Sequence, residues 1–113
     1  MKREIVIVKN VAKSIDNYIK KSKISQKDLD VFLKNLAEYP ESGDVIPGTS
    51  GLRKIRLKSL SGGKWGGFRV CYFYLYLKEC IYLLALYAKN DQEDITNEEK
   101  KILKEYVELL KRG

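Results

Sequence analysis

The sequence predicts an α+β fold, in which helices pack on an antiparallel-rich sheet. Three observations lead to this prediction. The β-branched residues 5–8 are typical of a buried strand, and two long tyrosine-rich segments separated by two polar residues are typical of a hairpin. A final segment carries apolar residues at helical spacing behind a capping signature. The 113 residues suffice for one modest core, so we expect residues 1–113 to form one domain.

Two helices are expected after the first strand. The first is indicated by apolar residues spaced along one helix face, which are Val11, Ile15, Tyr18 and Ile19. The polar residues 20–23 should end this helix. Ser25 with Asp28 is typical of a capped helix start, and the second helix should end near Tyr39-Pro40. That end is expected because the residue before a proline avoids the helical conformation.

The rest of the chain is predicted as a loop, three strands and a helix. Residues 41–51 read as a loop, and residues 52–58 as a strand with Lys54, Arg56 and Lys58 on one side. A glycine-rich turn (59–67) leads to strands 68–77 and 80–88, followed by an acidic turn at 91–94. Thr96 and Glu99 form a capping box for the last helix, whose apolar residues are Ile102, Leu103, Tyr106, Val107 and Leu110. The expected order is β-α-α-β-β-β-α, with Gly113 as the final cap.

The positive charge is concentrated in the middle of the chain. The formal net charge is +7, and residues 45–78 contain seven Lys or Arg and no acidic residue. Residues 1–44 contain nine basic and seven acidic residues, and residues 79–113 contain six and eight. One sign of charge gathered in one segment favours a polyanionic partner over a surface that serves solubility alone.

Several kinds of chemistry are excluded or disfavoured by composition. The chain has no histidine, which removes the commonest general acid or base. The glycine-rich residues 62–67 lack the end of a phosphate-binding loop, and no carboxylate cluster suggests a magnesium site. Cys71 and Cys80 are expected to be two buried thiols on neighbouring strands, with a disulfide as the alternative. We expect no metal and no cofactor.

The location in the cell is predicted from what the sequence lacks. No apolar run is long enough to span a bilayer, and the short run at residues 5–8 is too short for a signal-peptide core. We therefore expect a cytoplasmic protein.

A basic strand face remains as the candidate site. If the strands pair, Arg69 should lie near Arg56, beside Lys54. Six cations between Arg53 and Arg69, with no acid, favour a phosphate-binding face over lysines that merely protect a sheet edge. Tyr87 is the tyrosine expected to stack on a base. The candidate RNA-binding residues are Lys58, Lys64, Tyr87 and Asn90.

Several motifs in order resemble the HigB branch of the RelE toxin superfamily. They are Gly43-Asp44-Val45-Ile46, Gly48-Thr49, Gly51-Leu52-Arg53-Lys54-Ile55-Arg56, Gly66-Gly67-Phe68-Arg69-Val70 and Tyr87-Ala88-Lys89-Asn90. The resemblance implies a RelE-like fold and a ribosome-dependent mRNA endonuclease, held inactive by a co-expressed antitoxin with a helix-turn-helix. It places Lys54, Arg56 and Arg69 at cationic strand positions of such toxins. Asn90 and Thr96 depart from the pattern, because they stand where an arginine and a tyrosine occur.

These observations define a catalytic hypothesis and an alternative. Metal-independent RNA cleavage would use Lys54 as base, since neighbouring cations disfavour a protonated amine, with Arg56 and Arg69 as phosphate stabilisers. Lys89 would assist as acid or clamp. The alternative is a non-catalytic RNA- or ribosome-binding module that uses the same face. Lysines along the first helix (Lys9, Lys13, Lys20) are expected either to contact ribosomal RNA or to form a solvated face. The antitoxin could cover the basic face, the first strand's edge or the helix pair.

Overall fold

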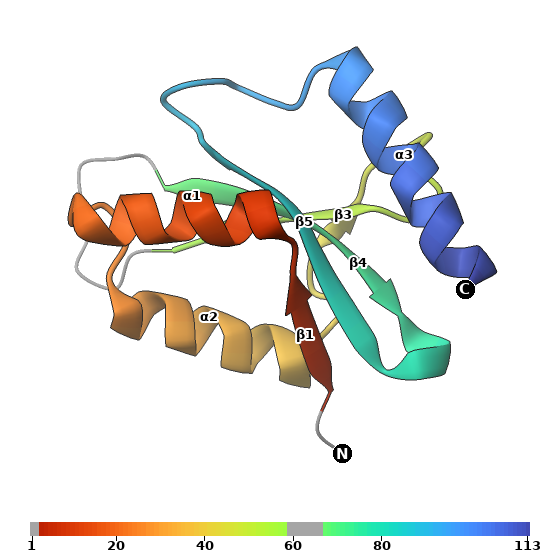
Figure 1. The fold of residues 1–113 in the computed structure, drawn as a ribbon, viewed down its shortest axis with the longest axis horizontal. Helices are drawn as coiled ribbons and strands as arrows, with labels where there is room; N and C mark the ends of the chain where they lie inside the picture. The colour runs from red at the N-terminus through yellow and green to blue at the C-terminus, as the bar shows by residue number, and fades with distance from the viewer. Residues whose placement is uncertain (1–2, 59–66) are drawn as a thin grey trace.

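The computed structural model describes residues 3–58 and 67–113, and it confirms the predicted α+β class. Figure 1 shows how the elements are arranged. In chain order they are β1 (Glu4–Ile7), α1 (Lys9–Lys20), α2 (Gln26–Glu38), β2 (Asp44–Val45), β3 (Arg53–Leu57), β4 (Phe68–Leu75), the 3-10 helix η1 (Tyr76–Lys78), β5 (Cys80–Ala88) and α3 (Asn97–Arg112). Two elements were not expected from the sequence. The predicted loop at 41–51 contains the short strand β2, and the predicted strand at 68–77 ends two residues early in η1.

The five strands form one sheet in the order β1-β5-β4-β3-β2. The β3, β4 and β5 strands pair antiparallel with their neighbours, as expected, whereas β1 runs parallel to β5. The β4–β5 register places Cys71 opposite Ala85 and Tyr72 opposite Leu83, so Leu84 is the extra residue of a bulge. The bulge shifts the alternation of β5 side chains by one residue. Apolar residues on both sides of the bulge therefore face one of the two cores.

Helices cover both faces of the sheet. On one face, α1 and α2 pack on alternate residues of the central strands, including Val70, Tyr72 and Leu83. On the other face, Val107 of α3 and Ile95 pack with Cys71, and with further strand residues. The alternation of strand side chains therefore builds two cores, one on each side. Successive side chains of β3 and β4 therefore point to opposite faces of the sheet.

The predicted helix signals are confirmed at three helix ends. The Ser25 hydroxyl accepts a hydrogen bond from the Asp28 N–H at 3.0 Å, and Thr96 and Glu99 form the capping box of α3. Gly113, at φ +86°, caps the same helix at its C-terminal end. These caps satisfy backbone groups that a helix end leaves unpaired.

One predicted apolar face is only partly buried. In α3, Val107 is fully buried, but Ile102 and Tyr106 are 65% and 43% exposed. The spacing of the apolar residues predicts the helix correctly. The sheet, however, covers only part of the apolar face of α3.

Cys71 and Cys80 are free, buried thiols, as expected. They lie on β4 and β5, opposite Ala85 and Leu75 rather than each other. Across residues 3–58 and 67–113, the structure contains no helix long and apolar enough to cross a membrane.

Candidate functional site

Three cationic side chains lie on the sheet face that also carries α3. Lys54 and Arg56 are two residues apart on β3, so they lie on the same side of the strand. The register pairs Lys54 with Cys71 and Arg56 with Arg69. The same register pairs Arg69 with Tyr87 of β5. The predicted alternation of Lys54 and Arg56, and the predicted proximity of Arg56 and Arg69, are therefore confirmed. We call Lys54, Arg56 and Arg69 the cation cluster.

The two arginines of the cluster converge at Gly67. A methyl group on Gly67 would lie 3.0 Å from Arg56 Nε and 3.6 Å from Arg69 Nη1. Gly67 has φ +84°, a conformation that glycine adopts without steric cost. The Gly67 carbonyl accepts a hydrogen bond from the backbone N–H of Lys89 at 3.2 Å. The residue that follows β5 therefore also lies next to Gly67. Two guanidinium groups this close together have the charge and the donors to bind a phosphate.

Lys54 is held by a carboxylate from outside the basic segment. Its Nζ lies 3.2 Å from Asp94 Oδ1, and the Tyr87 hydroxyl donates to the same oxygen at 3.4 Å. Burial alone would raise the pKa of Asp94, but the Ile95 N–H and the Lys54 ammonium together hold it below its ordinary value. Burial, with the negative charge of Asp94 nearby, raises the pKa of Tyr87 to about 12. At neutral pH, an ionised carboxylate is thus bound between an ammonium and a phenol.

Comparison with known proteins identifies the family of this chain. A family model described as the RelE toxin of the RelE/RelB toxin–antitoxin system matches residues 7–112. This chain belongs to the RelE toxin family. A structure of the Escherichia coli toxin RelE, a mutant with two arginines replaced by alanine and in the free state, superposes with a TM-score of 0.54. The match has 18% identity and covers 82% of this chain and 90% of that one, and it supports the RelE-like fold. The chain is therefore a toxin of a toxin–antitoxin system.

The remaining cations of the toxin's basic segment do not all join the cluster. Arg53 lies on the opposite side of β3, where its guanidinium donates to the carbonyls of Glu41 and Gly43 at 3.1 and 2.7 Å. Lys58 is exposed beyond β3, where it lines a cavity of about 340 Å³ with Arg56 and residues of α2. Lys64 lies outside the described residues. Arg53 therefore does not join the cation cluster, because strand alternation places it on the other side of β3.

Tyr87, Lys89, Asn90 and Thr96 have different positions. Tyr87 is only 6% exposed, so it offers no open ring face for the expected base stacking, and its hydroxyl donates to Asp94. Lys89 and Asn90 are exposed in the turn after β5. Thr96 is used as the N-cap of α3, where its hydroxyl accepts from the Glu99 N–H at 3.1 Å.

Asp94 is the site residue that the sequence analysis missed. Asp94 belongs to the acidic turn at 91–94, and sequence spacing does not show that this turn returns to β3. One sequence signal indicates its position. Asp94 lies in the short segment between Tyr87 and the capping box at Thr96, and a segment this short keeps it near the end of β5. A carboxylate there must lie near the cation cluster once α3 packs on the same face.

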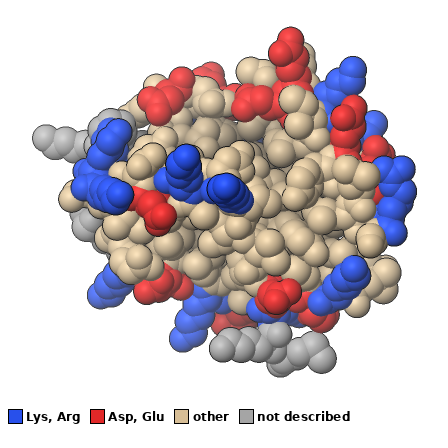
Figure 2. Space-filling view, in the orientation of Figure 1, with Lys and Arg blue, Asp and Glu red and all other residues tan. Residues whose placement is uncertain are grey.

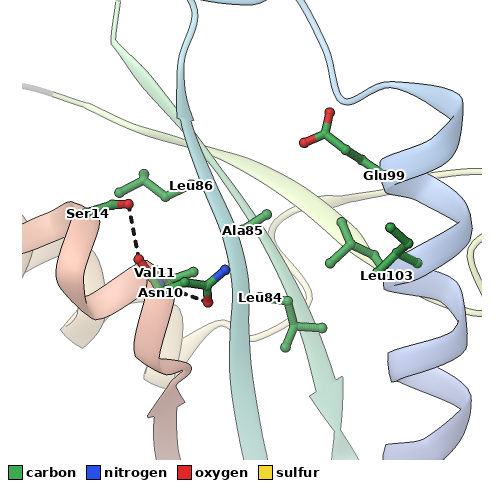
Figure 3. A pocket seen from close by; sticks show the side chains of 9 residues that line it. Asn10, Val11, Ser14, Leu84, Ala85, Leu86, Glu99 and Leu103 are labelled. Atoms are coloured by element: carbon green, nitrogen blue, oxygen red, sulfur yellow. Dashed lines mark hydrogen bonds between the residues drawn. The ribbon is translucent and has the colours of Figure 1, made fainter.

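A second hollow, between α1 and α3, differs in chemistry from the cation cluster. It has a volume of about 270 Å³ over β5, and Figure 3 shows Leu84, Leu86 and Leu103 around it. Glu99 is its one charged lining residue. Figure 2 shows that the middle of this face is mostly uncharged, with Lys and Arg side chains around its outline and over α1. This hollow is therefore a poor match for phosphate, unlike the cluster around Gly67.

Proposed function

We propose that this toxin cleaves mRNA on the ribosome without a metal, and that it is a HigB-like member of its family acting in the cytoplasm. The observation that carries the proposal is the convergence of Arg56 and Arg69 at Gly67, with Lys54 on the same face. Residues 1–113 would form one toxin domain, since the family model matches nearly all of them.

In the reaction, the ribose 2′-oxygen would bond to the adjacent phosphorus while the bond from phosphorus to the 5′-oxygen breaks, which leaves a 2′,3′-cyclic phosphate. The 2′-hydroxyl proton would pass to solvent, and a proton would be delivered to the leaving 5′-oxygen. The transition state gathers negative charge on the phosphate oxygens, and positioned cations stabilise this charge more than they stabilise the substrate. Arg56 and Arg69 would bind those oxygens, because two guanidinium groups already meet at that point. Lys58, Lys64 and Asn90 would contact the flanking RNA.

The role of Lys54 in proton transfer differs from the one that the sequence suggests. The ion pair between Lys54 and Asp94 requires a protonated Lys54, whereas a base must start without its proton. Lys54 is therefore proposed to stabilise charge on the phosphate or to protonate the leaving 5′-oxygen, rather than to act as the base. Lys89, whose backbone N–H donates to the Gly67 carbonyl, is proposed to assist as an acid for the leaving oxygen or as a clamp on the phosphate.

Replacing Arg69 tests whether the toxin is an enzyme. We expect induction of the wild-type chain to arrest growth and to fragment cellular mRNA. Arg69→Ala should lower the cleavage rate about a hundredfold or more, because it removes a preorganised donor to the developing charge. Arg112→Ala is the matched control, since it removes the same charge at the exposed end of α3. Both variants should show the wild-type circular dichroism spectrum and melting temperature.

The same assay distinguishes the alternative. Thr96 serves as a helix cap, not as an acid, which leaves a non-catalytic RNA-binding module as the second candidate. Growth arrest without new mRNA ends, or arrest unaffected by Arg69→Ala, would favour that module. A phosphorothioate at the cleaved position whose slow reaction is rescued by Mn²⁺ would contradict metal independence.

Membership of the family implies an antitoxin partner. We propose a helix-turn-helix antitoxin of the HigA kind, encoded next to the toxin. A further arm of the growth assay co-expresses the adjacent reading frame, and the expected result is restored growth with a stable complex. Neither binding nor rescue by that neighbour would remove this proposal.

A further inference from the structure

The segment between β5 and α3 returns to the cation cluster through one carboxylate oxygen. Asp94 Oδ1 accepts from Lys54 Nζ at 3.2 Å, from the Tyr87 hydroxyl at 3.4 Å and from the Ile95 N–H at 2.8 Å. Lys54 belongs to β3 and Tyr87 to β5, so this oxygen joins two strands to the start of α3.

The position of this carboxylate is fixed from both sides along the chain. Ile95 is 4% exposed and packs in the core beneath α3. Thr96 begins α3 with its capping box, and the Gln92 side chain donates to the Asp94 carbonyl at 2.9 Å. Asp94 is therefore held by packing and backbone contacts that do not depend on Lys54.

Lys54, in contrast, has a long side chain that needs a partner to remain in one place. A lysine ammonium sits on four flexible carbons, and ordering it costs conformational entropy. Among the described residues, Asp94 is its one ion-pair partner, at a half-exposed position. A half-exposed ion pair contributes little to the free energy of unfolding. The effect of the Lys54–Asp94 pair is therefore mainly to fix the position of the ammonium.

We propose that Asp94 is a positioning residue, which holds the Lys54 ammonium beside the Arg56 and Arg69 guanidinium groups for the cleavage step. The inference rests on the proposed function, because it deepens the role of Lys54 in that same site. Asp94 acts through Lys54 and does not itself contact the reacting atoms. A misplacement of about 1 Å in a reacting site can cost up to a hundredfold in rate, which sets the scale of the effect.

Asp94→Asn separates this role from a structural one. Asparagine keeps an oxygen that can accept from the Ile95 N–H and the Tyr87 hydroxyl, but it loses the charge that holds the ammonium. Glu93→Gln is the matched control, because it removes the same charge one residue away at an exposed position. Any effect of total charge should be equal in the two variants.

The first measurement needs no substrate. In the free toxin, the Lys54 ammonium should give a resolved ¹⁵Nζ resonance, assigned by its loss in Lys54→Ala. We expect this resonance to persist in Glu93→Gln and to disappear or merge with the mobile lysines in Asp94→Asn. An unchanged Lys54 resonance in Asp94→Asn would overturn the proposal, whether or not the toxin proves to be a nuclease.

The second measurement is a double-mutant cycle of cleavage on ribosomes. Asp94→Asn should lower the single-turnover rate about ten- to a hundredfold, with ribosome binding unchanged. In the Lys54→Ala background, the same substitution should have almost no further effect, because its target is gone. An undiminished loss in that background would overturn the proposal, since Asp94 would then act independently of Lys54.

Discussion

At the scale of the residue, the site combines cations that are at least partly exposed with an inert thiol beneath them. Cys71 lies opposite Lys54 in the register and is fully buried. Burial raises the pKa of the Cys71 thiol to about 12, and the Lys54 charge reduces this effect only in part. A thiol is a nucleophile only when it is deprotonated, so Cys71 supplies packing and no chemistry at neutral pH.

Alkylation tests this assignment of Cys71. At pH 8, far below a pKa of about 12, the thiol stays protonated, so iodoacetamide should leave Cys71 unmodified in the folded toxin. Burial also raises the pKa of Cys80, which should be protected in the same way. Mass spectrometry after the same treatment in denaturant should show both cysteines modified. Fast alkylation of Cys71 in the folded toxin would contradict its assignment.

At the scale of the element, one tyrosine of β4 fixes the segment that leads into β3. The buried Tyr72 hydroxyl donates to the Pro40 carbonyl and accepts from the Gly43 N–H, both at 2.8 Å. A methyl group on Gly43 would lie 2.7 Å from the Tyr72 ring, so glycine is needed for this close approach. Arg53 binds the Gly43 carbonyl from β3 itself. These contacts set where β3, and with it Lys54 and Arg56, begins.

Removing the Tyr72 hydroxyl should therefore destabilise the whole fold. Tyr72→Phe leaves the buried Gly43 N–H without its acceptor, which costs about 1–3 kcal/mol. Tyr76→Phe is the control, because Tyr76 is 66% exposed on η1. Urea unfolding should show a lower midpoint for Tyr72→Phe alone. Equal midpoints for the two variants would show that this hydroxyl does not anchor the segment.

The elements that the sequence predicted well are those with local signals. The caps at Ser25 and Thr96 depend on residues three positions apart, and the alternation of Lys54 and Arg56 depends on a period of two. The strand β2 was missed because two residues carry no periodic pattern. The parallel pairing of β1 with β5 joins segments that are far apart in the sequence, and no local pattern indicates it.

At the scale of the whole molecule, the candidate site is assembled from segments that are distant in sequence. The sequence predicted Lys54, Arg56 and Arg69, because strand pairing brings neighbours in sequence together. It did not predict Asp94, which is 40 residues from Lys54, or the burial of Tyr87 under the segment that carries Asp94. Both depend on where α3 packs, and only the tertiary structure determines this.

Among the described residues, the cation cluster is small and offers little surface on which to hold and bend a free RNA strand. The ribosome holds mRNA in a fixed path, and such positioning can offset a weak set of proton carriers. Lys9, Lys13 and Lys20 are all exposed on α1 and could contact ribosomal RNA while the cluster faces the message. The central claim is therefore that the toxin reaches its full rate only on the ribosome.

The most direct test compares cleavage of one mRNA, free and on translating ribosomes, at equal toxin concentration. We predict a rate at least a hundredfold higher on ribosomes, corresponding to a few kcal/mol of positioning. This advantage should fall when Lys9, Lys13 and Lys20 are replaced together by alanine. It should remain when three exposed lysines of α2 and α3 (Lys27, Lys34 and Lys101) are replaced instead. Equal rates on free and ribosome-bound mRNA would contradict the account.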